Sequence, residues 1–219
     1  MSTQGAVTVL LVDDHAVVRE GYRRLLENSP SIHVVGEAAD AQSAYLAWQE
    51  HLPQVTVMDI SLPGASGIEA LRRIRTRDPD ARVLMFSMYE DAVFAARALQ
   101  AGARGYVTKA AAPQVLVEAV LAIAAGKPYI VASVAQELAL RSLSPAGDAA
   151  EALSPREFEV LRMLVDGKAV GEIARSLGLT TKTVANHQSA LRQKLGAGTA
   201  VQLLQAAARL GLVPRAPAA

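Results

Sequence analysis

Apolar runs and amphipathic stretches alternate along the first 130 residues. Five short runs rich in β-branched residues predict strands, at residues 7–12, 32–37, 55–58, 82–86 and 106–108. Stretches with helical spacing of apolar positions accompany them, at residues 17–27, 41–50, 67–75, 92–100 and 113–124. Five strand–helix repeats predict an α/β fold, a doubly wound five-stranded parallel sheet with helices on both faces.

After Gly126 the strand pattern stops, and the rest of the chain is expected to be helical. A helix at 134–140 leads into residues 142–150, whose Ser, Pro, Gly and Asp content is typical of a linker. From residue 153 the pattern predicts a small all-α domain. Its first helix begins with the capping-box sequence Ser154-Pro155-Arg156-Glu157, and helices over 172–177 and 181–195 flank the turn Gly178-Leu179. The expected organisation is a domain at 1–130, a helix and linker at 131–151 and a helix-turn-helix domain at 152–219.

Composition excludes several classes of protein. Hydrophobic residues make up 51% of the chain, which is typical of globular proteins, and no charge-free stretch approaches the ~18 residues of a membrane helix. The first residues lack the basic and apolar regions of a signal peptide, so we expect a cytoplasmic protein with no membrane partner. The absence of cysteine excludes disulfides, thiolate catalysis and Cys-based zinc sites.

Charge is unevenly distributed. Residues 1–130 hold 12 Lys and Arg against 14 Asp and Glu, whereas residues 131–219 hold 10 against 7. No acid follows Glu172, although six basic residues do. This bias favours a polyanion-binding surface near the C-terminus, and an ordinary solvated face is the alternative.

Polar side chains follow four of the predicted strands. Asp13 and Asp14 come after the first strand and Asp59 after the third. Because the carboxyl ends of parallel strands meet at one edge of a sheet, these carboxylates are expected to converge, where they would repel and raise one another's pKa. A hard divalent cation with oxygen ligands relieves the repulsion, and Mg²⁺ is the natural choice.

Ser87 follows the fourth strand and Lys109 the fifth, which adds a hydroxyl and a cation to the same edge. This set suits phosphoryl transfer onto Asp59, with charge neutralised by the cation and a hydrogen bond from the hydroxyl. In the simpler alternative, the two N-terminal acids cap the first helix and Lys109 pairs with one of them.

The last helix of the helix-turn-helix has two faces. At ~100° per residue, Lys182, Asn186, Ser189 and Gln193 lie opposite the apolar Val184, Leu191 and Leu195. The polar set suits contacts to DNA base edges. Phosphate contacts are expected from the flanking Thr181, Thr183, Arg192 and Lys194. An ordinary helical hairpin with a polar face remains the alternative.

Residues 7–125 resemble the receiver domain of response regulators, through LLVDDH, MDISLPGASG, the Ser87 hydroxyl and GYVTK. The resemblance implies that Asp59 accepts the phosphoryl group. It implies Asp14, Asp59 and the Ser61 carbonyl as direct ligands of Mg²⁺, Asp13 as a ligand through water, and Tyr106 as the switch aromatic. The chain departs from the family at Ala110, where proline is common, and at Met88, a usually small position from which the side chain is expected to shield Asp59.

Residues 152–213 resemble the LuxR/NarL-type DNA-binding domain, through LSPREFEVLRMLVDGK, EIARSLGLTTKTVANHQSALRQKLG and VQLLQAAARLGLV. Many relatives carry Lys or Arg where this chain has Ala185, so base contact there is apolar at most. The two resemblances together imply a NarL/FixJ-type response regulator that is not a metabolic enzyme. Its partners would be a sensor histidine kinase, double-stranded DNA and, once phosphorylated, a second copy of itself.

Two other functions compete with this interpretation. A Mg²⁺-dependent phosphohydrolase also uses an aspartate nucleophile on an α/β sheet, but Asp59-Ile60-Ser61 supplies no second acid two residues on. A DNA-binding scaffold would use its first domain only to dimerise, and the complete set of acids argues against that.

Overall fold

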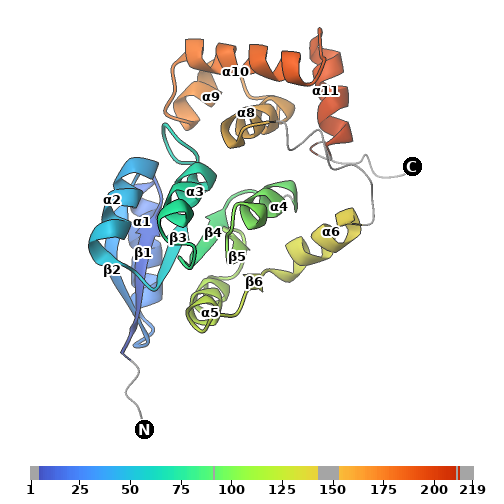
Figure 1. Cartoon of the computed structure of the whole chain (residues 1–219). Coiled ribbons are helices and arrows are strands. Elements are labelled where there is room, and N and C mark those ends of the chain that lie inside the picture. Colours follow the sequence, from blue (N-terminus) through green and yellow to red (C-terminus); the bar gives the residue numbers. More distant parts are fainter. Residues whose placement is uncertain (1–4, 91, 143–152, 211, 213–219) are drawn as a thin grey trace. The chain divides into compact units, whose positions relative to one another are not determined.

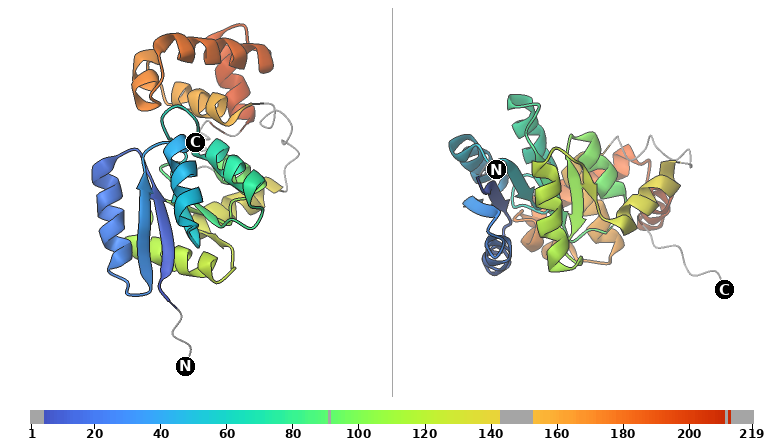
Figure 2. Two further views of the ribbon diagram at one scale, coloured as in Figure 1. Left: turned by 60° about the vertical axis from the view of Figure 1, so that its left-hand side comes forward. Right: turned by 90° about the horizontal axis from the view of Figure 1, so that it is seen from below.

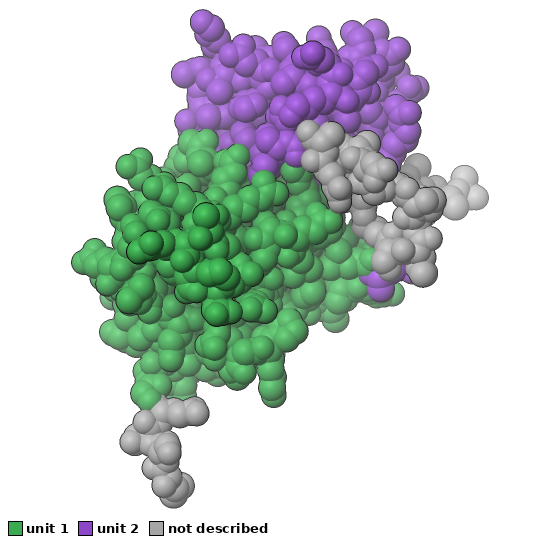
Figure 3. All heavy atoms as spheres, in the orientation of Figure 1, with its two compact units in different colours: residues 1–138 green, residues 139–219 purple. Residues whose placement is uncertain are grey.

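The structure is a computed structural model, and it describes residues 5–90, 92–142, 153–210 and 212. The chain divides into two compact units, residues 1–138 and 139–219, coloured separately in Figure 3. The boundary falls within helix α6 (Ala132–Ser142). Most of the expected linker lies outside the described residues. Among the helices that are described, none is both long and apolar enough to cross a membrane.

The first unit is built on a parallel sheet, as predicted (Figure 1). The strand order is β2-β1-β3-β4-β5-β6, and each predicted strand lies within two residues of its expected bounds. The strands are β1 (Val7–Val12), β2 (Ile32–Ala38), β3 (Val55–Met58), β4 (Val83–Ser87), β5 (Gly105–Thr108) and β6 (Tyr129–Ile130). The helices are α1 (Ala16–Glu27), α2 (Ala41–His51), α3 (Gly67–Arg77), α4 (Ala92–Gln100) and α5 (Pro113–Ala124).

The expectation of five strands is corrected to six. β6 has only two residues, too few for the period-two alternation that identifies a strand in sequence. It forms because the edge of β5 has unpaired backbone groups: Tyr129 N donates to the Arg104 carbonyl and Val131 N to the Tyr106 carbonyl, both at 3.2 Å.

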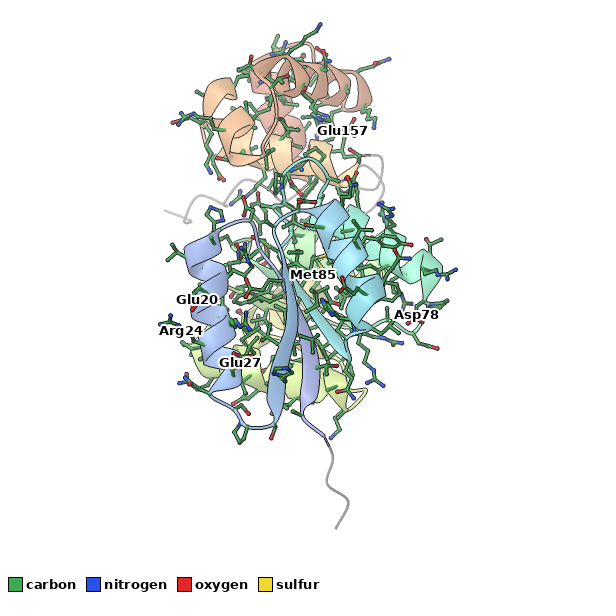
Figure 4. The ribbon with its side chains drawn as sticks, turned by 90° about the vertical axis from the view of Figure 1, so that its left-hand side faces the viewer. Glu20, Arg24, Glu27, Asp78, Met85 and Glu157 are labelled. Carbon is green, nitrogen blue, oxygen red and sulfur yellow. The ribbon has the colours of Figure 1, made fainter. Side chains whose placement is uncertain are left out.

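Helices cover both faces of the sheet (Figure 2). On the face covered by α1 and α5, Leu26 and Val120 are fully buried in a core that includes Val57 of β3. Met85 of β4 is also fully buried, and it is labelled in Figure 4 together with Glu20 and Arg24, an ion pair on α1. Because the core fixes every strand, it also fixes where the strands end, and the candidate site lies at those ends.

The second unit contains α8 (Pro155–Val165), α9 (Val170–Ser176), α10 (Thr181–Lys194) and α11 (Ala200–Arg209), which confirms a helical domain with a helix-turn-helix. Ser154 forms the predicted capping box at the start of α8. Gly167, Gly178 and Gly196 adopt positive φ at the ends of helices, a conformation that glycine adopts without strain. The buried apolar side chains of this unit include Phe158, Leu161, Ile173, Val184, Leu191 and Ala207.

Candidate phosphoacceptor site and DNA-binding helix

Three strand ends bring opposite charges into contact at the carboxyl edge of the sheet. Asp13 follows β1, Asp59 follows β3 and Lys109 follows β5. Lys109 Nζ donates to Asp13 Oδ2 at 2.5 Å and to Asp59 Oδ2 at 2.6 Å. The three side chains are 6% exposed or less. The cation therefore pairs with both carboxylates and not with one of the N-terminal acids alone.

Burial and ion pairing have opposite effects on the pKa values of this cluster. Burial raises the pKa of Asp59 above its ordinary value, and Lys109 offsets only part of that rise. For Lys109, burial favours a lower pKa, but the two carboxylates outweigh it and raise the pKa above its ordinary value. The lysine is therefore held charged, while the ionised form of Asp59 depends on it.

Asp14 carries the feature that best fits a metal ion. Its Oδ1 is buried and has no hydrogen-bond partner among the described residues, although His15 Nδ1 lies 2.7 Å away. Asp13, Asp14 and His15 each offer a ligand atom within 4.8 Å of the others. A buried carboxylate oxygen without a hydrogen bond, close to the Asp13 carboxylate, suits Mg²⁺, which prefers oxygen ligands. The residues present therefore fit the predicted cation.

Two residues that the sequence pattern did not single out hold the acids in place. Arg19 of α1 donates to the Asp13 carbonyl at 2.5 Å and to Glu37 of β2 at 2.8 Å. Gly67 begins α3 so close to Asp59 that a Cβ there would lie 1.9 Å from the Asp59 carbonyl oxygen. Only the three-dimensional contact identifies these two positions, because an arginine in a helix and a glycine near a loop are common.

Tyr89 connects the two residues expected to act as a switch. Its backbone N–H donates to Ser87 Oγ at 3.2 Å, and its carbonyl accepts from the Tyr106 hydroxyl at 2.7 Å. The Tyr89 ring stacks on Phe94 with centroids 3.9 Å apart, and its hydroxyl receives a hydrogen bond from Ser61 Oγ. Tyr106 is fully buried and so already points inward.

Two further predictions concern groups close to Asp59. Met88 is 72% exposed, so the structure does not support the expectation that it shields the carboxylate. The backbone N–H of Ser61 donates to Asp59 Oδ1 at 3.3 Å, which places the Ser61 backbone beside the phosphoacceptor candidate.

In the second unit, α10 presents a polar face to solvent. Val184 and Leu191 are fully buried, and Thr180 caps the helix by accepting from Thr183 N at 3.1 Å. The exposed members of the predicted set are Thr181, Lys182, Ala185, Asn186, Ser189, Arg192 and Lys194. Seven of the eight predicted positions are thus exposed on α10, and Thr183 is partly buried.

Two of the predicted DNA contacts, Thr183 and Lys194, already have side-chain partners within the unit. The Thr183 hydroxyl lies 2.8 Å from the Thr180 hydroxyl. Lys194 Nζ donates to Glu157 Oε2 of α8 at 2.7 Å. The sequence could not reveal the second contact, since it joins residues 37 positions apart.

Comparisons with known proteins agree with both units. Residues 9–121 match the response regulator receiver domain, and residues 151–207 match the bacterial regulatory proteins of the luxR family. The response regulator UvrY of Escherichia coli (strain K12) is 38% identical over 208 residues, covering 94% of this chain and 95% of UvrY.

Solved structures of RcsB match over most of the chain. RcsB of Salmonella enterica serovar Typhimurium, bound to the promoter P1flhDC in the presence of the phosphomimetic BeF3⁻, gives a TM-score of 0.61 at 29% identity, covering 94% of this chain and all of RcsB. A structure of two RcsB dimers bound to two parallel DNAs gives the same TM-score, identity and coverage. The chain therefore belongs to the DNA-binding response regulators of two-component systems, with a receiver domain followed by a LuxR-type DNA-binding domain that regulates transcription.

Proposed function

We propose that Asp59 accepts a phosphoryl group and that this modification controls operator binding by α10. The observation that carries the proposal is the position of Lys109, which contacts both Asp13 and Asp59 beside the unsatisfied oxygen of Asp14. A site with one lysine paired to two carboxylates, and with a third carboxylate beside Asp13, suits an additional cation and an anionic group.

The transfer forms a bond between an Asp59 oxygen and phosphorus. The bond from phosphorus to the donor breaks, and its electron pair leaves with the donor, either a phosphohistidine of a sensor kinase or acetyl phosphate. Lys109 neutralises charge on the phosphoryl oxygens, and the Ser87 hydroxyl exchanges its bond from Tyr89 N for one that it donates to the phosphoryl group.

Magnesium suits the same group of side chains. Asp13, Asp14, Asp59 and the Ser61 carbonyl would hold it, and its charge would stabilise the phosphoryl oxygens. The requirement for a cation follows from the carboxylates themselves, since Lys109 alone balances only part of their charge.

The exposed face of α10 is the proposed DNA contact. Lys182, Asn186 and Ser189 would reach base edges, while Ala185 offers at most an apolar contact. Thr181, Thr183 and Arg192 would contact phosphates. Two copies binding as a dimer would place two such helices on half-sites about one helical turn apart. Because the target is DNA, this function places the protein in the cytoplasm.

Intact-mass measurement after incubation with acetyl phosphate and Mg²⁺ tests the first step. We expect one added phosphoryl group in the wild type and in the control Asp80→Asn, and none in Asp59→Asn or in the presence of EDTA. Full labelling of Asp59→Asn would contradict the assignment.

Titration of a duplex selected from a random library tests the second step. We expect tighter binding after phosphorylation, and equal affinities would contradict the proposal that phosphorylation controls DNA binding.

A further inference from the structure

We propose that Lys194 is a positioning residue of the DNA-binding domain: its ion pair with Glu157 fixes the orientation of α10, and Lys194 does not contact DNA. This inference rests on the proposed function, in which the exposed face of α10 binds DNA.

The pair is built into the start of α8. Glu157, labelled in Figure 4, uses one oxygen, Oε2, to accept from Lys194 Nζ and from the Ser154 backbone N–H, each at 2.7 Å. The side chain of Glu157 is 8% exposed and that of Lys194 is 40% exposed. The last residue of α10 is therefore bonded to the same carboxylate that caps α8.

Each charge also suits the helix that carries it. Glu157 lies in the first turn of α8, where a negative charge is stabilised by the helix dipole, and Lys194 ends α10, where a positive charge is stabilised. Burial favours a higher pKa for Glu157, but Lys194 and Ser154 lower it below the ordinary value. Both partners are thus held charged and close together.

Lys194 is also badly placed to reach DNA beside the predicted reading residues. At ~100° per residue it lies ~120° around the helix from Lys182 and ~80° from Asn186, but only ~60° from the buried Leu191. At ~1.5 Å per residue it lies ~18 Å along the axis from Lys182, at the C-terminal end, whereas the N-terminal part of a recognition helix contacts base edges. Both residues are exposed, but Arg192 differs from Lys194 because it forms no ion pair with any described residue.

The ion pair between Lys194 and Glu157 limits how α10 can tilt. Val184 and Leu191 hold the helix against its domain by apolar contacts, which have no preferred direction. A hydrogen-bonded ion pair at one end is directional, and it limits rotation and tilt of the helix. Loss of the pair is therefore expected to misplace the reading face by a small amount. Sequence-specific binding should suffer more than binding to arbitrary DNA.

A double-mutant cycle tests the proposal in the full-length protein. Glu157→Gln removes the charge but keeps an oxygen for the Ser154 N–H, since glutamine also completes a capping box. Affinity is measured for a duplex selected from a random library and for a scrambled duplex, over a range of salt concentrations. All variants are compared at a temperature at which their circular dichroism equals that of the wild type.

We expect Lys194→Ala and Glu157→Gln each to weaken binding to the selected duplex, by roughly threefold to tenfold. The double variant should be no weaker than either single variant, and Lys194→Arg should restore wild-type affinity. The dependence on salt should stay unchanged in Lys194→Ala, whereas Arg192→Ala, which loses a phosphate contact, should lower the slope by about 0.9.

Three results would overturn the proposal. A lower salt slope in Lys194→Ala would show a phosphate contact, and tighter binding by Glu157→Gln would show that the pair withholds Lys194 from DNA. Additive losses would show that the two residues act independently. Unchanged sequence preference in Asn186→Ala and Ser189→Ala would instead overturn the reading face, and both proposals with it.

Discussion

Lys109→Met would remove the charge between Asp13 and Asp59 while keeping an unbranched side chain of similar length. The three side chains are at most 6% exposed, so the two carboxylates could not be rehydrated without disturbing the site. Removing one partner of a buried ion pair costs about 3 kcal/mol or more. We therefore expect the free energy of unfolding of the receiver unit to fall by about 3 kcal/mol near neutral pH.

The loss should depend on pH in a defined direction. Burial already raises the pKa of Asp59, and without Lys109 this pKa would rise further. A carboxyl group whose pKa is higher in the folded state than in the unfolded state destabilises the fold only when it is ionised. The cost of Lys109→Met should therefore be small in acid and grow as the pH rises through the folded-state pKa of Asp59.

Urea denaturation followed by tryptophan fluorescence measures this quantity. Trp48 is the single tryptophan of the chain and is buried in α2, so it reports the receiver unit specifically. The exposed Lys127 in the same unit provides the matched control, and Lys127→Met should change stability by less than about 0.5 kcal/mol. A change of that small size in Lys109→Met at neutral pH would refute the reasoning. So would a loss that increases on acidification.

Two other predictions follow from single contacts. Gly67→Ala would force a methyl group against the Asp59 carbonyl, so we expect phosphorylation by acetyl phosphate to slow by about tenfold or more. The control Gly21→Ala, whose added methyl group meets nothing within 4 Å, should keep the wild-type rate. Time-resolved mass spectrometry measures both rates, and equal rates would contradict the importance of the contact. Because Lys194 and Ser154 lower the pKa of Glu157, the second unit should lose stability as the pH falls from the ordinary glutamate value of about 4.3 through the folded-state pKa. Thermal denaturation should show a smaller loss of stability for Glu157→Gln than for the wild type over that pH range. An identical loss in both proteins would contradict the assignment of this pH dependence to Glu157.

The elements were largely predictable because their signals are local. Repeated apolar runs and helical spacing identified each strand but β6, and the capping sequence at Ser154 fixed the start of α8. β6 was missed because its two residues pair only with backbone groups that β5 leaves available. Such a strand depends on its neighbour and leaves no periodic signal of its own.

The sequence predicted which residues form the candidate site, but only some of the contacts between them. Parallel-strand topology places Asp13, Asp59 and Lys109 at one edge, and the structure brings them into contact there. Sequence gives no comparable rule for helices that cross in space. The pairing of Lys194 with Glu157 therefore appeared only in the structure, and it changed the role expected for that lysine.

The strand order also bears on how the chain folds as it is synthesised. β1 emerges from the ribosome first, yet it lies between β2 and β3 in the sheet. One of its edges stays open until α1, β2 and α2 have all been made, and an unpaired strand edge invites association with other chains. Sheets with pairings between distant segments fold slowly, whereas small helical domains with local contacts fold fast. Chaperone demand and soluble yield are therefore expected to depend on the receiver unit, and variants of α10 should express as well as the wild type.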